Sequence, residues 1–285
     1  MPRPNYTFEA FGTPWSIETN YELSESLKKT IQERIEQFDI TYSRFRKDSL
    51  VTKIAKKEGM FTLPDDSLEL FSFYRQLYDV TGGKVTPLIG DTISNAGYDA
   101  DYSFTEKQQQ SVPSWDDTMI WNGVRLTTKR PVILDVGAAG KGYMVDIISE
   151  ILHKHDIDDY VIDASGDLKH KGELENMVGL EHPTKPGIII GTVSVQNKSL
   201  CSSSVSRRSW GNGMHHVFDP DTLLPTNDVV ATWVVAESTL VADGLATALF
   251  FTDPVHLRET FKYDYVRMFA DGSVEYSSFF EGGLF

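Results

Sequence analysis

The segment at residues 130–146 constrains the fold most, because it joins an apolar run, a glycine-rich turn and a helical pattern without interruption. Residues 132–134 form a short apolar run of the kind that makes a buried strand. From Tyr143 onwards, apolar residues recur at helical spacing on one face. Three glycines between these parts let the backbone turn tightly and approach a ligand: Gly137, Gly140 and Gly142. We therefore expect a strand, a close turn and a helix N-terminus here.

A turn of this kind, with the Lys141 amine beside a helix N-terminus, is a natural site for a phosphate group. Lys141 is therefore a candidate contact for a phosphorylated cofactor. The segment is not a P-loop, because Asp135 stands where the first glycine of that motif should be and Gly142 follows the lysine. An ordinary strand-to-helix connection fits the same residues equally well, so this stretch alone leaves both interpretations open.

The chain is acidic, with a net charge of −14 over 285 residues. This charge argues against nucleic acid or an anionic membrane as a partner, so an anionic ligand would need a local positive patch or a metal ion. The single cysteine excludes intrachain disulfides and thiolate zinc sites. We find no apolar run of signal-peptide or membrane-span length. We expect a cytoplasmic protein that folds as one domain over residues 1–285.

The remaining pattern predicts an α+β fold. Strands are expected over residues 8–19, with a break at 12–14, and over residues 159–163, 187–195 and 229–236. Helices are expected after Ser24, after a capping box formed by Asp66 and Glu69, and over residues 237–251. Residues 265–277 are typical of a hairpin with a type I′ turn at Asp271 and Gly272. The irregular alternation of helices and strands favours α+β over a doubly wound sheet.

Four further segments carry weaker signals. Residues 85–98 are expected to be irregular and residues 101–118 to form a polar surface excursion. Residues 41–49 form a basic segment with Tyr42 and Phe45, which suits either a solvated loop or an aromatic platform beside positive charge. The small residues 201–204 carry hydroxyls that could bind anion oxygens, although plain loops look the same.

Asp243 and Thr247 give the sharpest chemical signal, because residues four apart on a helix emerge side by side. The surrounding sequence is strongly apolar, and a bare carboxylate there needs a partner. A hard cation such as Mg²⁺ takes oxygen ligands and commonly keeps substrate phosphate in its coordination shell. Alternatively, Asp243 lies close enough to the helix start to be a charge that faces the helix dipole. The spacing alone does not separate these interpretations.

His215 and His216 are adjacent, so only one of them is expected to point into any given site. The spacing of a three-histidine or Glu-x-x-His zinc site is absent. A surface loop is the simpler interpretation of the pair, and a catalytic imidazole is the alternative.

With these residues in view, the chain resembles the ApbE family of FAD:protein FMN transferases over nearly its whole length. The segments that carry the resemblance occur in the family's order at residues 11–15, 43–49, 83–87, 135–146, 163–167, 216–220 and 242–247. Among them, Asp135-Val-Gly-Ala-Ala-Gly-Lys-Gly-Tyr-Met-Val-Asp146 is similar to the family's Asp-Leu-Gly-Gly-Ile-Ala-Lys-Gly-Tyr-Ala-Val-Asp, and Ala242-Asp-Gly-Leu-Ala-Thr247 is similar to its Ala-Asp-Ala-Leu-Ala-Thr.

The resemblance implies an ApbE-like fold of mostly antiparallel sheets with packed helices. It also implies a Mg²⁺-dependent enzyme that cleaves FAD, releases AMP and attaches FMN by a phosphoester bond to a Ser or Thr of an acceptor flavoprotein. By position, the Mg²⁺ ligands would be the Gly140 carbonyl, Asp243 and Thr247, and His216 would take the proton from the acceptor hydroxyl. The positions that match FAD contacts are Phe11, Phe45, Lys84, Val85, Thr86, Gly137, Tyr143 and Phe218.

The chain also departs from the family pattern. Thr86 replaces an Asp, Ser165, Ser204 and Leu223 replace glycines, Ala55 falls where the family often has Asn, and Phe45 lacks the usual phenol hydroxyl. Two other functions therefore stay open: an FAD pyrophosphatase that uses water as acceptor, and a flavin-binding protein without turnover. The intact metal pair and His216 favour an active enzyme.

Overall fold

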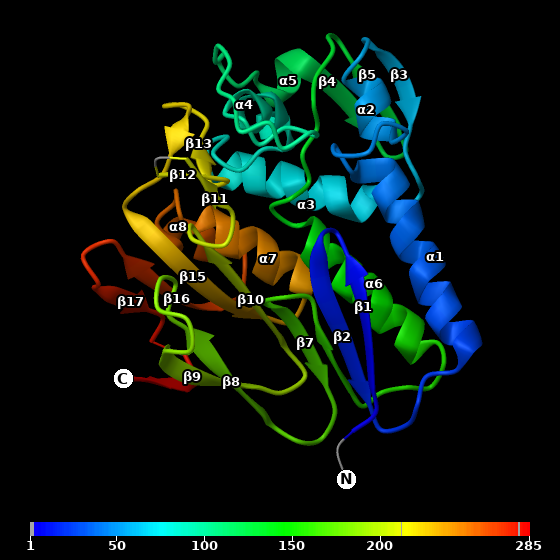
Figure 1. Cartoon of the computed structure of the whole chain (residues 1–285), viewed down its shortest axis with the longest axis vertical. Helices are drawn as coiled ribbons and strands as arrows, with labels where there is room; N and C mark the ends of the chain where they lie inside the picture. The colour runs from blue at the N-terminus through cyan, green and yellow to red at the C-terminus, as the bar shows by residue number, and fades with distance from the viewer. Residues whose placement is uncertain (1–2, 212, 279) are drawn as a thin grey trace.

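A computed structural model describes residues 3–211, 213–278 and 280–285. Its largest element is an eight-stranded sheet (Figure 1). In spatial order its strands are β1 (Asn5–Ala10), β2 (Thr13–Thr19), β6 (Tyr160–Asp163), β7 (Asp167–Lys171), β10 (Ser199–Ser204), β15 (Val229–Ala236), β16 (Asp264–Phe269) and β17 (Val274–Tyr276). All strand pairs in the described ranges are antiparallel, so the prediction of an α+β fold with mostly antiparallel sheets is confirmed.

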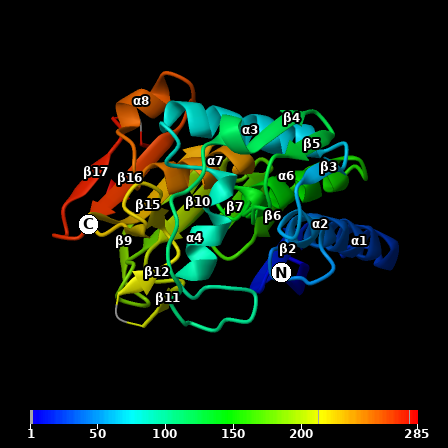
Figure 2. The ribbon, with the colours of Figure 1, turned by 90° about the horizontal axis from the view of Figure 1, so that it is seen from above.

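Helices cover one face of this sheet at its centre. The helices of the described residues are α1 (Glu25–Tyr42), α2 (Leu50–Ile54), α3 (Ser67–Val80), the 3₁₀ turn η1 (Pro87–Ile89), α4 (Gly90–Asn95), α5 (Trp115–Thr118), α6 (Gly140–His153), α7 (Thr239–Ala248) and α8 (Pro254–Arg258). α6 and α7 pack against each other and against the central strands, and α3 lies over α7 (Figure 2). Within the described residues, no helix is long and apolar enough to cross a membrane.

Smaller sheets complete the fold. A three-stranded sheet runs in the order β18 (Gly282–Leu284), β9 (Ile189–Val195) and β8 (Asn176–Glu181), and another in the order β3 (Gly59–Thr62), β5 (Arg125–Thr128) and β4 (Met119–Asn122). Two short hairpins are formed by β11 (Ser209–Trp210) with β12 (Met214–His215), and by β13 (Phe218–Asp219) with β14 (Leu224–Pro225).

The side chains of β15 are buried on both faces of the sheet. Val234 and Ala236 belong to the core beneath the helices. Trp233 and Val235 belong to a second core, which lies between the large sheet and the three-stranded β18–β9–β8 sheet and includes Leu180 of β8. Because successive side chains of a strand point to opposite faces, an uninterrupted apolar run is buried only when both faces are packed. β15 therefore lies in the middle of two hydrophobic layers.

Several predicted elements occur as expected. Ser24 is the N-cap of α1, where its hydroxyl accepts a hydrogen bond of 3.3 Å from the Leu27 amide. The strand at residues 229–236 has the predicted bounds, and the helix expected over 237–251 is α7 at 239–248. The strands expected at 159–163 and 187–195 are β6 and β9.

The strand predicted at residues 132–134 is wrong. Val132 and Leu134 are buried as expected, but this segment joins no sheet. Its backbone hydrogen bonds go elsewhere: the Ile133 amide donates to the Asp91 carboxylate at 3.0 Å, and the Asp135 amide donates to the Pro87 carbonyl at 2.8 Å. A short apolar run predicts burial, and here the burial occurs without a strand partner.

The helix predicted after Asp66 is α3, but the capping box predicted at its start does not form. Asp66 is the N-cap residue, but its side chain makes no cap hydrogen bond, because its carboxylate forms an ion pair with Arg34 of α1. The turn predicted at Asp271 is not type I′, since Gly272 has a φ of 87° whereas Asp271 does not have a positive φ.

Three other segments are more regular than predicted. Residues 8–19 form the β1–β2 hairpin rather than one broken strand, and residues 85–98 contain η1 and α4. The small-residue run at 201–204 lies in β10, where each residue pairs with β15. Short polar side chains weaken a strand signal, and the neighbouring strands supply the pairing that the sequence does not show.

Candidate functional site

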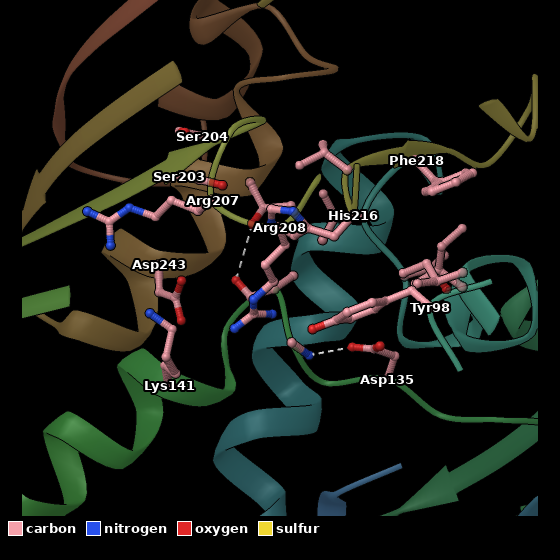
Figure 3. Close-up of a pocket in the computed structure, with 18 of the residues that line it drawn as sticks. Tyr98, Asp135, Lys141, Ser203, Ser204, Arg207, Arg208, His216, Phe218 and Asp243 are labelled. Atoms are coloured by element: carbon pink, nitrogen blue, oxygen red, sulfur yellow. Dashed lines mark hydrogen bonds between the residues drawn. The ribbon is translucent and has the colours of Figure 1, made fainter. Parts of the chain in front are cut away.

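A cavity of about 310 Å³ lies where the ends of α6 and α7 meet the β10 strand and the β11–β12 hairpin (Figure 3). Segments from most of the chain contribute to its wall. The lining residues are Thr13, Arg44, Phe45, Lys84, Val85, Thr86, Ile89, Ile93, Tyr98, Asp135, Gly137, Ala138, Lys141, Ser165, Ser202, Ser203, Ser204, Arg207, Arg208, His216, Val217, Phe218, Asp243, Thr247 and Phe251. Ten of the thirteen predicted site residues are in this set, so the fold brings them together.

Asp243 is the deepest acidic group of the cavity, with 7% of its surface exposed. Its carboxylate accepts a hydrogen bond of 2.9 Å from the Gly142 amide in the first turn of α6. One turn further along α7, the Thr247 hydroxyl lies 3.5 Å from the Ala138 carbonyl oxygen. The carboxylate, the hydroxyl and this carbonyl therefore bring oxygen atoms to the same end of the two helices.

Gly142 makes this close approach possible. A Cβ atom at this position would lie 2.3 Å from the Thr239 carbonyl oxygen and 2.6 Å from the Asp243 Cβ. Real Cβ atoms essentially never come so close to backbone, so only glycine fits where α6 crosses α7. The glycine predicted to admit a ligand thus admits the neighbouring helix.

The two helices also cap each other. Asp146 of α6 accepts hydrogen bonds from the Ser238 hydroxyl at 2.8 Å, the Thr239 amide at 3.1 Å and the Leu240 amide at 2.8 Å, all at the N-terminus of α7. In return, Asp243 of α7 accepts from the first turn of α6. Carboxylates at helix N-termini satisfy unpaired amides and face the positive end of the helix dipole. This reciprocal pair fixes the position of Asp243 relative to the α6 N-terminus.

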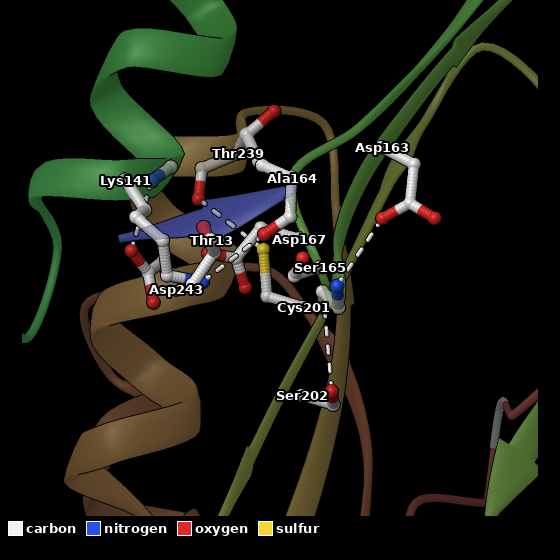
Figure 4. A network of polar contacts seen from close by, with 12 residues as sticks. Thr13, Lys141, Asp163, Ala164, Ser165, Asp167, Cys201, Ser202, Thr239 and Asp243 are labelled. Atoms are coloured by element: carbon white, nitrogen blue, oxygen red, sulfur yellow. Dashed lines mark hydrogen bonds and ion pairs between the residues drawn. The ribbon is translucent and has the colours of Figure 1, made fainter. Parts of the chain in front are cut away.

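Lys141 is held beside this acidic group. Its ammonium pairs with the buried Asp167 carboxylate and lies 3.4 Å from the Ala164 carbonyl (Figure 4). Burial alone would lower the pKa of Lys141, but Asp167 and Asp243 more than offset it and the pKa is raised. Burial and the Asp167 charge raise the pKa of Asp243 well above its usual range. The positive charge near Asp243 is thus not enough to offset the cost of ionising its buried carboxyl group.

The oxygen donors at Asp243 form only part of a coordination shell. Among the described residues, no group of three or more His, Cys, Asp and Glu side chains is arranged to hold a metal. A cation at Asp243 would therefore depend on hydroxyl, carbonyl and ligand oxygens. Such an all-oxygen, incomplete protein shell suits Mg²⁺, which keeps waters and substrate phosphates as ligands, and does not suit a structural zinc.

His216 follows β12 and lines the cavity, whereas His215 points away from it. The His215 Nε2 lies 2.7 Å from the Thr226 carbonyl, which gives that ring a structural role. In His216, the Nδ1 atom is buried without a hydrogen-bond partner among the described residues. Burial, the Arg208 charge and His215 lower the pKa of His216 to about 3. The imidazole is therefore neutral at physiological pH and can accept a proton.

Aromatic rings form the wall opposite Asp243. Phe45 and Tyr98 contact each other with ring centroids 5.5 Å apart, and Phe218 lies on the same side of the cavity. The Arg44 guanidinium lies 4.2 Å from the Phe45 centroid and donates to Asp135 at 2.6 Å. This arrangement offers flat apolar surface with positive charge behind it, as a conjugated ring system prefers.

The predicted contacts at residues 84–86 also lie in the wall. The Lys84 ammonium pairs with Asp219 at 2.6 Å and with Asp221 at 2.7 Å, which ties this segment to the loop after His216. Thr86 replaces the family's Asp but still caps η1, because its hydroxyl accepts from the Leu88 amide at 3.2 Å. The substitution therefore keeps the local capping interaction.

Three predicted site residues do not line the cavity: Phe11, Gly140 and Tyr143. Phe38 of α1 lies beside all three. Its ring centroid is 5.4 Å from that of Phe11 and 6.4 Å from that of Tyr143, and a Cβ at Gly140 would touch it at 3.4 Å. The Tyr143 hydroxyl donates to the Asp66 carbonyl at 2.7 Å. The Phe11 and Tyr143 rings therefore pack around Phe38 and do not form part of the cavity wall.

Sequence inspection missed several lining residues. Arg44, Tyr98, Arg207 and Arg208 were not among the candidates, although they supply much of the charge and aromatic surface of the cavity. A usable signal was present for the last two, since adjacent arginines follow a serine cluster in an otherwise acidic chain. Five cationic side chains and two carboxylates line the cavity, so the site carries the local positive patch that an anionic ligand needs.

Comparison with known proteins identifies the family and the fold. The profile of the ApbE family matches residues 11–269. A relative from Buchnera aphidicola subsp. Schizaphis graminum, named FAD:protein FMN transferase, is 24% identical over 269 residues, which cover 85% of this chain and 77% of the relative. A relative of the same name from Treponema pallidum is 25% identical over 250 residues, covering 76% and 68%.

Solved structures share the fold. The ApbE protein from Thermotoga maritima has a TM-score of 0.85 at 19% identity, covering 98% of this chain and 99% of that chain. The flavin transferase ApbE from Vibrio cholerae has a TM-score of 0.79 at 19% identity, covering 97% and 98%. The shared architecture therefore extends over essentially the whole chain.

Proposed function

The chain belongs to the ApbE family, and on that premise we propose that it is a Mg²⁺-dependent FAD:protein FMN transferase, the activity for which its relatives are named. It would take FAD as substrate, release AMP and attach FMN by a phosphoester bond to a Ser or Thr of an acceptor flavoprotein. The observation that carries this proposal is that Asp243, Thr247, Lys141 and His216 line one cavity together with an aromatic wall.

Different sides of the cavity suit the isoalloxazine ring and the diphosphate of FAD. Phe45, Tyr98 and Phe218 provide apolar ring faces for the isoalloxazine. Lys141, at the first turn of α6, faces the position that a diphosphate would take between the helix ends. Phosphate oxygens near the N-terminus of α6 would meet the positive end of the helix dipole.

Asp243 and Thr247 would hold Mg²⁺, together with the Gly140 backbone carbonyl and the substrate phosphates. The ion would neutralise charge on the diphosphate and orient the leaving AMP. Asp243 is prepared for this role, because its carboxylate is buried and fixed by the Gly142 amide before any cation arrives.

His216 would act as the general base. The acceptor hydroxyl oxygen bonds to the FMN phosphorus, the bond from that phosphorus to the AMP phosphate oxygen breaks, and the hydroxyl proton passes to the imidazole. The depressed pKa of His216 keeps its imidazole deprotonated, as a general base must be, and it also makes the imidazole a weak base in the empty cavity. Removal of the proton and departure of AMP balance the reaction without another reactant.

The test is incubation of the purified protein with FAD and Mg²⁺, with and without candidate acceptor proteins. Flavin fluorescence that stays with the denatured acceptor in a gel, together with stoichiometric AMP, supports the transferase. Free FMN formed at the same rate without acceptor would show an FAD pyrophosphatase instead. Flavin binding with no AMP under either condition would leave a flavin-binding protein.

We propose one domain over residues 1–285, a cytoplasmic location, and partners limited to FAD and the acceptor, with neither nucleic acid nor a membrane. The acidic net charge of −14 supports the absence of polyanionic partners. Fractionation of cells that express the protein would test the location.

A further inference from the structure

Arg208 and His216 face each other at the base of the β11–β12 hairpin. Within the hairpin, Ser209 pairs with His215 and Trp210 pairs with Met214. The next pair outward is Arg208 with His216, and the His216 amide donates to the Arg208 carbonyl at 3.3 Å. Directly opposite residues in an antiparallel pair project from the same face. Both side chains therefore enter the cavity from one element.

The Arg208 guanidinium lies between the two acidic walls of the cavity. Figure 3 draws it between the side that carries Lys141 and Asp243 and the side that carries Asp135 and Tyr98. Its positive charge favours the ionised form of the Asp135 carboxylate, and so contributes to the lowered pKa of Asp135. The guanidinium is thus central to the cavity.

Arg208 differs from the other four cations that line the cavity. Arg44 pairs with Asp135, Lys84 with Asp219 and Lys141 with Asp167, and Arg207 lies 3.9 Å from Glu181. For Arg208, no Asp or Glu carboxylate of the described residues lies within 4.0 Å of the guanidinium nitrogens. A positive charge held in a partly enclosed site without a counter-ion attracts an anion.

We propose that Arg208 is a catalytic residue that binds the FAD diphosphate through its guanidinium and stabilises the AMP phosphate as it leaves. The inference rests on the proposed function and adds a residue to it. A guanidinium presents paired N–H donors that match two phosphate oxygens, which an ammonium cannot do. When the acceptor oxygen bonds to the FMN phosphorus and the bond to the AMP phosphate breaks, negative charge grows on the AMP oxygens beside Arg208.

The pairing with His216 gives Arg208 a second effect on the reaction. Its positive charge contributes to the low pKa of His216 in the empty cavity. An anionic diphosphate that binds Arg208 would offset this charge, so the imidazole becomes a stronger base when substrate is present. Arg208 and His216 are therefore coupled through their pairing at the start of the β11–β12 hairpin. A diphosphate bound to the guanidinium would also change the basicity of the imidazole.

Binding of two flavins tests the proposal. FAD carries the diphosphate and riboflavin carries no phosphate, so quenching of flavin fluorescence reports the two affinities separately. Loss of one charge-assisted contact in Arg208→Gln should weaken FAD binding by about 10- to 100-fold and leave riboflavin binding within about twofold. Arg208→Lys should keep part of the FAD affinity but lose AMP release, because it keeps the charge without the paired donors.

Arg125→Gln is the matched control, since Arg125 is exposed on β5 outside the cavity. Unchanged FAD affinity in Arg208→Gln would overturn the proposal. An equal loss for FAD and riboflavin would also overturn it, because that pattern indicates a structural role. If Arg208→Gln does not fold, Arg208→Lys decides alone, and full AMP release by that variant would refute the paired-donor contact. If the wild type binds FAD but releases no AMP, the proposed function fails while the comparison of affinities still stands.

Discussion

Asp243 shows how a single residue can be unfavourable for the fold and suited to a site. Its carboxylate is buried near the Asp167 carboxylate, and the nearest cation, Lys141, already pairs with Asp167. An ionised group in this position is destabilising unless a further positive charge arrives. The surrounding helices hold the group there because Gly142 donates to it and Asp146 anchors the N-terminus of α7.

Asp243→Asn should separate these two effects. The amide oxygen can still accept from Gly142, but the uncompensated charge is gone, so the metal-free protein should gain about 1 kcal/mol of unfolding free energy. Mg²⁺-dependent AMP release should fall at least about a hundredfold, since the metal contributes several kcal/mol to such reactions. Thermal melts with and without Mg²⁺, beside an AMP assay, measure both.

The exposed Asp79→Asn on α3 serves as control for that variant. Wild-type AMP release by Asp243→Asn would reject the assignment of Asp243 as a metal ligand. A lower melting temperature without metal would show instead that the carboxylate stabilises the fold.

His216 makes a prediction about pH. Burial, the Arg208 charge and His215 lower the pKa of His216 to about 3, and the opposing effect of the Asp135 carboxylate does not offset them. A base is active in its deprotonated form, which is therefore present throughout the range from about pH 5 to pH 8. The value of kcat/KM for FAD should consequently show no rise centred near pH 6.5, where an ordinary histidine titrates.

Two alanine variants, one at His216 and one at an exposed histidine, test whether His216 is the base. His216→Ala should bind FAD with wild-type affinity while transfer slows by about 10²- to 10⁴-fold, and the exposed His155→Ala should transfer normally. A rise in kcat/KM near pH 6.5 that disappears in His216→Ala would contradict the depressed pKa.

At the scale of elements, the site depends on the crossing of α6 and α7. The helices approach so closely that position 142 has no room for a side chain, and each helix carries a carboxylate that caps the other. Helix caps and close packing usually serve stability alone. Here they also set the distance between the Lys141 turn and the Asp243–Thr247 face.

Gly142→Ala should therefore disrupt both stability and the site. The added Cβ meets the Thr239 carbonyl oxygen at 2.3 Å, so one helix must move, at a cost of about 1–3 kcal/mol. Gly140→Ala is a control in the same helix turn, because its Cβ meets only side-chain atoms, at 3.3 Å or more. In that variant, the better helix propensity of alanine should leave stability equal or up to about 1 kcal/mol higher.

Urea unfolding and calorimetric titration with Mg²⁺ measure the two variants. Gly142→Ala should show a lower unfolding midpoint and weaker Mg²⁺ binding, because Asp243 moves with α7. Equal stability of the two variants would mean that the helices tolerate a wider separation than the packing indicates.

Elements were predictable from sequence where one local signal determined them. Ser24 starts α1, and the apolar run at 229–236 is a strand with the bounds expected of it. The prediction failed at residues 132–134, since the hydrogen-bond partners Asp91 and Pro87 lie about forty positions away in the chain. The local sequence pattern indicates which residues are buried and at what spacing. The backbone hydrogen-bond partners of a segment depend on the tertiary structure.

The site was predictable to a different extent. The spacing of Asp243 and Thr247 is a local property of one helix, and the structure brings both to the cavity with His216. Phe11 and Tyr143 were assigned by resemblance alone, and in this chain both rings pack against Phe38 and neither lines the cavity. For Arg208, the adjacent arginines were a local signal, but the fold was needed to show that no carboxylate of the described residues pairs with this guanidinium.

At the scale of the whole molecule, an acidic protein encloses a positively charged cavity. The net charge is −14, yet the cationic side chains outnumber the carboxylates in the cavity wall. Segments from Thr13 to Phe251 contribute to that wall, so the cavity exists only when nearly the entire chain is folded. Ligand binding should consequently be coupled to global unfolding rather than to the opening of one loop.

This coupling predicts a single cooperative shift in melting temperature. A ligand present at about a hundred times its Kd adds about 2.7 kcal/mol to the free energy of unfolding, or roughly 5 °C or more for a chain of this size. FAD with Mg²⁺ should raise the whole calorimetric transition by that amount, and Asp243→Asn should lose the part that requires Mg²⁺. If only part of the transition moved, the β10–α7 region would unfold separately from the rest, and the cavity could not depend on segments as distant as Thr13.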